Sequence, residues 1–154
     1  MRKYRPSISR LVLLLMPTVS LVAQTQHRTA YTGTWKLNLA KSTYQPGTAP
    51  QSLNLRFTPE GNNIVSGVDK KGTPFEWAIP WSDGKEVPVE DIKNATAIQR
   101  IQGHTLDTVL KEAGKSVMTI HDVLSLDGKT HMGTITYVDE KGHRTQHLEF
   151  YDKQ

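Results

Sequence analysis

Residues 33–39 read GTWKLNL, a stretch in which Trp35, Leu37 and Leu39 alternate with polar residues. Apolar residues at every second position lie on one face of a β-strand, whereas a helix repeats them every three or four residues. The same alternation returns twice farther along, at Leu53, Leu55 and Phe57, and at Phe75, Trp77, Ile79 and Trp81. Half-buried strands are therefore the predicted elements of this chain.

Turns that contain glycine separate these stretches, 11 to 19 residues apart, at Gly61, Gly72, Gly84, Gly103, Gly114, Gly128 and Gly142. Turn signals at this spacing indicate consecutive antiparallel strands. We expect ten strands, near residues 33–39, 52–58, 63–69, 74–81, 85–89, 96–101, 105–111, 116–125, 130–138 and 144–152, and no substantial helix. Because closing a sheet removes its exposed edges, the predicted fold class is all-β, a single antiparallel up-and-down barrel of about 8–10 strands.

The first 23 residues have the features of a secretory signal peptide. A basic segment with Arg2, Lys3, Arg5 and Arg10 precedes an apolar run that ends in Val22-Ala23. That run is about a dozen residues long, whereas a membrane-spanning helix needs roughly 20. We therefore expect a signal peptide over 1–23, a short extension over 24–32 and a barrel domain over 33–154, with no membrane span after cleavage. The predicted location is periplasmic or secreted.

The charge balance argues against nucleic acid as a partner. Although 19 Lys and Arg residues face 15 Asp and Glu residues, the predicted signal peptide holds four of the basic residues and no acidic one, so the remaining chain is formally neutral. A neutral domain lacks the basic surface of a nucleic-acid-binding protein. Cysteine is absent, which excludes disulfides, thiolate metal ligands and a thiol nucleophile. No cofactor is predicted, and no protein partner is identified.

The hairpin centred on Asp127-Gly128 predicts the inner wall of the barrel. If Asp127 and Gly128 form a two-residue loop, the residue numbers of each pair across the hairpin add up to 255. Ile120 then faces Ile135 and Met118 faces Tyr137, which makes one face of the hairpin apolar. Continuing that face across the next turn adds Leu148 and Phe150, and the aromatic stripe adds Trp77. The predicted ligand-binding wall is therefore Trp77, Met118, Ile120, Ile135, Tyr137, Leu148 and Phe150, in which the Tyr137 hydroxyl also orients a ligand.

Two ionisable residues, Asp122 and His131, fall on the same apolar face. There they must lie near an end of the barrel or find partners. A buried, hydrogen-bonded structural pair is the favoured interpretation, and an acid–base pair inside the barrel is the alternative. The chain has none of the short hydrolase, metalloprotease or nucleotide-binding motifs.

His121 and His147 are weak candidates for a metal site. If paired positions of the last hairpin sum to 281, His121, Thr134 and His147 form one row, with the histidines about 9.6 Å apart. Two ligands at that separation could only just share a metal, and Glu149 is the one further ligand in view. Solvated surface histidines are the favoured interpretation, so no metal is predicted.

The segment from Gly33 to Ser42, followed by Pro46-Gly47 and Ala49-Pro50, resembles the small exported lipocalin-like proteins of bacteria. The segments 127–130 and 151–154 match that pattern too, and Gly33-x-Trp35 is similar to the first-strand signature of lipocalins. The resemblance implies a calycin-type barrel closed at the Trp35 end. It also implies that Trp35 packs against an arginine of a late strand, for which Arg144 is the candidate.

These observations favour an exported barrel that binds a small hydrophobic ligand in its interior without catalysis. The alternative is a structural or interaction module of the cell envelope with a packed core. A calycin-type enzyme and a histidine-based metal binder are minor alternatives. Interior volume separates the first two, because a cavity of about 300 Å³ or more favours binding. The connection 40–51 is predicted to be either a lid over the mouth or a crossing loop.

Overall fold

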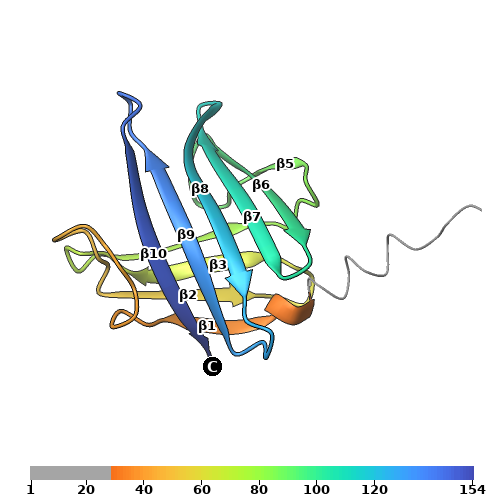
Figure 1. Ribbon diagram of the computed structural model, residues 1–154. Helices are drawn as coiled ribbons and strands as arrows, with labels where there is room; N and C mark the ends of the chain where they lie inside the picture. Colours follow the sequence, from red (N-terminus) through yellow and green to blue (C-terminus); the bar gives the residue numbers. More distant parts are fainter. Residues whose placement is uncertain (1–28) are drawn as a thin grey trace, which may run out of the picture.

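The computed structural model describes residues 29–154, so the predicted signal peptide, residues 1–23, lies outside the described residues. A helical turn at residues 29–31 leads into ten antiparallel strands (Figure 1). They are β1 (Gly33–Leu37), β2 (Ser52–Phe57), β3 (Asn63–Val68), β4 (Pro74–Ile79), β5 (Glu86–Pro88), β6 (Ala95–Gln102), β7 (Thr105–Glu112), β8 (Lys115–Leu124), β9 (Thr130–Val138) and β10 (Arg144–Lys153). The predicted all-β fold and its ten strands are confirmed. Within the described residues, no helix has the length and apolar character needed to cross a membrane.

A single sheet contains all ten strands and curls into a nearly closed barrel. Its strand order is β4-β3-β2-β1-β10-β9-β8-β7-β6-β5, so β1 and β10 pair near the middle. The two edges approach at one bridge between Ala78 on β4 and Glu90 just after β5, where the Glu90 N–H donates to the Ala78 carbonyl at 2.8 Å. Strands β1–β4 run across the direction of the longer strands β7–β10, so these two groups of strands form two walls of the barrel (Figure 1).

The register of β8 against β9 is the one predicted from Asp127-Gly128. Met118 pairs with Tyr137 and Ile120 pairs with Ile135. The register of β9 against β10 is one residue away from the prediction, because His147 pairs with Ile135 and Leu148 with Thr134. The cause is a three-residue loop: the Asp139 N–H donates to the His143 carbonyl, and Gly142 has a φ of 83°, a left-handed conformation that favours glycine.

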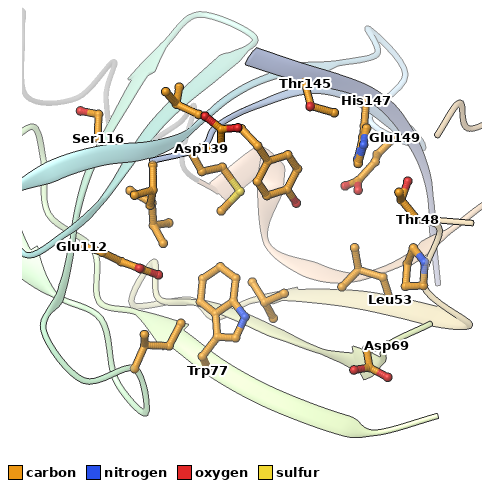
Figure 2. Close-up of a pocket in the computed structure, with 18 of the residues that line it drawn as sticks. Thr48, Leu53, Asp69, Trp77, Glu112, Ser116, Asp139, Thr145, His147 and Glu149 are labelled. Atoms are coloured by element: carbon orange, nitrogen blue, oxygen red, sulfur yellow. The ribbon is translucent and has the colours of Figure 1, made fainter. Parts of the chain in front are cut away.

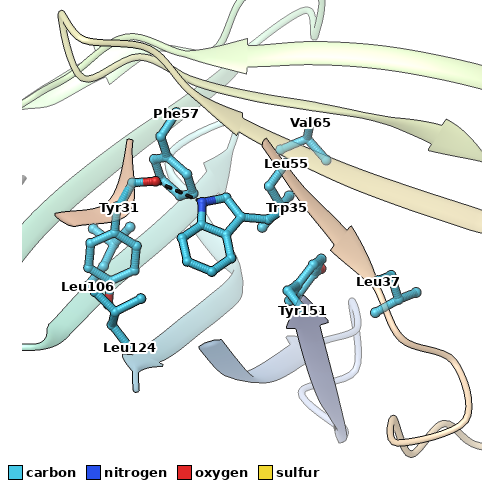
Figure 3. Close-up of a cluster of buried hydrophobic side chains, with 9 residues drawn as sticks. All are labelled: Tyr31, Trp35, Leu37, Leu55, Phe57, Val65, Leu106, Leu124 and Tyr151. Carbon is cyan, nitrogen blue, oxygen red and sulfur yellow. Dashed lines mark hydrogen bonds between the residues drawn. The ribbon is translucent and has the colours of Figure 1, made fainter. Parts of the chain in front are cut away.

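One end of the barrel is filled by large side chains that gather around Trp35 (Figure 3). Trp35 is fully buried, and its indole N–H donates to the Tyr31 carbonyl at 2.7 Å. The Tyr31 hydroxyl donates to the carbonyl of His104 at 2.9 Å, which ties the helical turn to the loop between β6 and β7. The buried members of this plug are Tyr31, Trp35, Leu37, Leu55, Phe57, Val65, Leu106, Leu124 and Tyr151.

The cation beside Trp35 is Lys153, so the expectation of Arg144 was wrong. The Lys153 ammonium nitrogen lies 4.9 Å from the centre of the indole ring. Trp35 and Lys153 are partners in the register of β1 against β10, whereas Arg144 pairs with Val138 at the opposite end of β10. A cation over an aromatic face is favourable whichever basic side chain supplies it.

Candidate functional site

The half of the barrel away from Trp35 holds a cavity of about 1420 Å³ (Figure 2). Its wall is made by residues of β2, β3, β4, β7, β8, β9 and β10, and its mouth by the turns at residues 69–70, 112–116 and 139–143. Thr48 and Pro50 also line it, so the connection between β1 and β2 reaches the mouth. An earlier part of that connection runs along β10, where Thr43 bridges Leu148.

Three of the predicted wall residues, Trp77, Met118 and Tyr137, line the cavity. Ile120 and Ile135 lie on the same inner face as Met118 and Tyr137 but are not among the residues that border the cavity. The apolar part of the wall is completed by Leu53, Leu55, Val65, Phe75, Ile92, Leu110 and Val117. As ligand contacts, Trp77, Met118, Tyr137, Ile120 and Ile135 stay predictions.

Leu148 and Phe150 were placed on the wrong face of β10. Because side chains alternate along a strand, the one-residue difference in register turns both outward. It turns His147, Glu149 and Tyr151 inward, and all three line the cavity. The signal for this register was the sequence Asp139-Glu140-Lys141-Gly142, which repeats the pattern of Asp69-Lys70-Lys71-Gly72 and forms the same three-residue loop.

The buried carboxylate of Glu149 is the centre of a polar cluster on the cavity wall. It accepts hydrogen bonds from the hydroxyls of Tyr44 at 2.7 Å and Tyr151 at 2.5 Å. Burial, with the charge of Glu149 as the second cause, raises the pKa of both tyrosines well above its ordinary value. Both hydroxyls therefore stay protonated and remain donors to Glu149.

His147 lies two residues before Glu149 on the same face of β10 (Figure 2). It is 8 % exposed, and within the described part of the chain neither ring nitrogen has a hydrogen-bond partner. Its ring packs against two aromatic rings, with centroids 4.9 Å from Tyr44 and 5.3 Å from Tyr137. A buried polar group without a partner costs free energy that a bound molecule could recover.

Asp122 is a second buried carboxylate of the inner face, between the cavity and the plug. It pairs with Gly133, which in turn pairs with Glu149, so the two carboxylates flank a residue without a side chain. A Cβ atom on Gly133 would lie 2.7 Å from an Asp122 carboxylate oxygen, so glycine makes room for it. Burial, and then the charges of Glu149 and Asp107, raises the pKa of Asp122 to about 8.

The predicted hydrogen-bonded pair of Asp122 and His131 is not formed. In the described structure, neither ring nitrogen of His131 has a partner, and burial lowers its pKa to about 3. The ring instead stacks on Trp35 at 4.8 Å and meets the edge of Tyr151 at 4.5 Å. His131 is thus a neutral aromatic part of the plug.

His121 and His147 lie on opposite faces of the sheet, so the row that would have joined them does not exist. His121 is on the outer face, where its Nδ1 lies 2.6 Å from an Asp107 carboxylate oxygen. The register shift that turned Leu148 outward turned His147 inward. Over residues 29–154 there is no group of three or more His, Cys, Asp or Glu side chains that could hold a metal ion.

No family model matches the chain, and no curated protein matches it either. Among solved structures, it is similar to one described as "Crystal structure of fluorescent protein UnaG wild type", with a TM-score of 0.54 and 17 % sequence identity. The match covers 82 % of this chain and 98 % of that one. At this identity the likeness concerns the fold. With the nearly closed ten-stranded sheet, it shows that the two chains share an antiparallel β-barrel fold.

Proposed function

We propose that this chain is an exported carrier that binds a small hydrophobic molecule inside its barrel without changing it chemically. The observation that carries the proposal is the cavity of about 1420 Å³, which exceeds the roughly 300 Å³ at which ligand pockets begin. Its wall combines apolar and aromatic side chains with a few converging polar groups, the usual composition of a small-molecule site.

The alternative, a module with a packed core, requires a filled interior, whereas the interior of this barrel holds the cavity of about 1420 Å³. Export rests on the basic and apolar segments of residues 1–23. Binding without chemistry rests on the sequence, which holds none of the common short catalytic motifs.

The test is native mass spectrometry of the protein purified from its own host, together with binding of the apolar dye Nile red. We expect the mass spectrum to show an additional bound molecule. We also expect Nile red to fluoresce more strongly with the protein, and the molecule extracted from the protein to displace the dye and reverse this rise. Trp77→Ala should weaken dye binding about tenfold or more, because Trp77 supplies a large part of the wall.

Leu126→Ala is the matched control, since Leu126 is 90 % exposed on the loop between β8 and β9. Equal dye binding by the control and the original chain excludes adsorption at that surface. A protein that is always isolated empty and does not take up the dye would overturn the carrier proposal.

A further inference from the structure

Among the Asp, Glu, Lys and Arg residues that line the cavity, the acidic ones predominate. Five carboxylates line it, from Asp69, Glu112, Asp139, Glu140 and Glu149, against two ammonium groups, from Lys70 and Lys115. All except Glu149 are in or beside the turns at the mouth. Backbone N–H groups lower the pKa of Asp69 and of Asp139, so both carboxylates keep their charge near neutral pH.

Deeper in the cavity, Glu149 and the two hydroxyls that bond to it offer a ligand hydrogen-bond acceptors. The hydroxyls of Tyr44 and Tyr151 use their protons on Glu149, so each offers a second group only its oxygen lone pairs. An ionised carboxylate accepts and never donates. A ligand carboxylate placed here would oppose Glu149 with a like charge, whereas a donor group would find several acceptors.

His147 adds an independent indication that this position takes a ligand. It is more than nine-tenths buried, it lines the cavity, and the described residues provide no partner for either nitrogen. A neutral imidazole offers one acceptor nitrogen and one N–H donor, two residues along β10 from the Glu149 carboxylate, and the acceptor can receive a proton donor of the ligand. The rings of Tyr44 and Tyr137 lie beside His147 and also line the cavity, and aromatic rings attract cations.

We infer that the cavity selects apolar molecules that carry a protonated nitrogen base, with the cationic head at Glu149 and His147 and the apolar body against Trp77 and its neighbours. This inference rests on the proposed function and gives it a ligand class. Figure 2 shows the division: His147 and Glu149 lie on one wall, from β10, and Trp77 projects from another, on β4. The carboxylates at the mouth attract a cation, and the acceptors around Glu149 receive its N–H groups. Both features therefore favour the same class of ligand.

The experiment compares three molecules with one chain length and different heads: dodecylamine, dodecanol and dodecanoate. At pH 7 the amine is positive, the alcohol neutral and the acid negative. Displacement of Nile red from the host-purified protein, stripped of bound molecules, gives the three affinities. We expect the amine to bind about tenfold more tightly than the alcohol, and the acid to bind most weakly.

Glu149→Gln keeps the size of the side chain and removes the charge. It should weaken dodecylamine binding about tenfold and change dodecanol binding less than about threefold. Glu76→Gln, at an exposed position of β4 that does not line the cavity, is the matched control and should weaken amine binding less than about threefold. The order of the three affinities is measured on the unmodified protein, so it tests the inference even if Glu149→Gln does not fold.

Three results would contradict the inference, and they are distinguishable. Dodecanoate binding at least as tightly as dodecylamine, with Nile red still bound, overturns the preference for a base and leaves the carrier proposal intact. An undiminished amine preference in folded Glu149→Gln protein overturns the role of Glu149. Failure of the dye and of all three molecules to bind overturns the carrier proposal and the inference together.

Discussion

The two ends of this barrel are built from the same strands, yet one is solid and the other is hollow. Trp35 on β1 and Trp77 on β4 both point inward, and they are joined through the register by Leu55 and Val65. Trp35 is fully buried under Tyr31 and beside His131, whereas Trp77 borders the cavity. One difference comes from outside the row, since Tyr31 of the helical turn at 29–31 belongs to the buried cluster around Trp35 and its carbonyl accepts the indole N–H. The alternation along each strand decides which side chains point into the barrel. Whether those side chains pack together depends on which residues from other segments fill the space between them.

Trp35→Ala should break the solid end and give the largest loss of stability. Removing a fully buried tryptophan costs about 3–5 kcal/mol of the free energy of unfolding. Trp77→Ala should cost less, about 1–2 kcal/mol, because Trp77 is only partly buried and already borders open space. Urea denaturation followed by circular dichroism measures both. Equal losses in the two variants would contradict the contrast between a filled and a hollow end.

The sequence predicted features that depend on local pattern better than features that depend on one loop or on distant contacts, for a physical reason. Neighbouring residues specify the turns and the alternation of apolar side chains. These local features determine the number of strands, the pairing of β8 with β9 and the position of Trp35. The face of β10 depends on one loop: a single extra residue between Asp139 and His143 exchanged Leu148 and Phe150 for His147 and Glu149. Glu149 and Tyr44 are 105 positions apart and meet only when the first connection folds over β10, and no local pattern reports that contact.

Asp122 lies between the two ends, and its protonation provides the next test. A folded pKa of about 8 against an ordinary value of 3.8 means that the folded state holds a proton that the unfolded state has lost. Stability from this group is fully present below about pH 4 and is lost as the pH rises toward 8. Between pH 6.5 and 8 the loss amounts to about 1–2 kcal/mol.

Asp122→Asn should remove that dependence, so the difference in free energy of unfolding between variant and original protein should move in favour of the variant by about 1–2 kcal/mol from pH 6.5 to 8. Taking the difference cancels other groups, including His131, which loses its stabilising contribution only as the pH falls below about 6.5. Asp83→Asn, in an exposed loop, is the control and should show no such change. Parallel pH profiles for Asp122→Asn and the original protein would mean that Asp122 is ionised in the barrel.

Lys153 should give the smallest effect, and it tests how the solid end is closed. Its ammonium lies over the Trp35 ring and its aliphatic stem passes Gly33, where an added Cβ would meet the Lys153 Cε at 3.0 Å. Lys153→Met keeps the stem and removes the charge, so it isolates the cation–π contact, worth about 0.5–1 kcal/mol at an exposed site. Lys36→Met, on the exposed face of the same strand pair, removes the same charge away from Trp35. A loss of stability with Lys153→Met that exceeds the loss with Lys36→Met, measured by urea denaturation, is expected. Equal losses would mean that the plug is held by apolar packing around Trp35 alone, with the cation contributing only its charge to the surface.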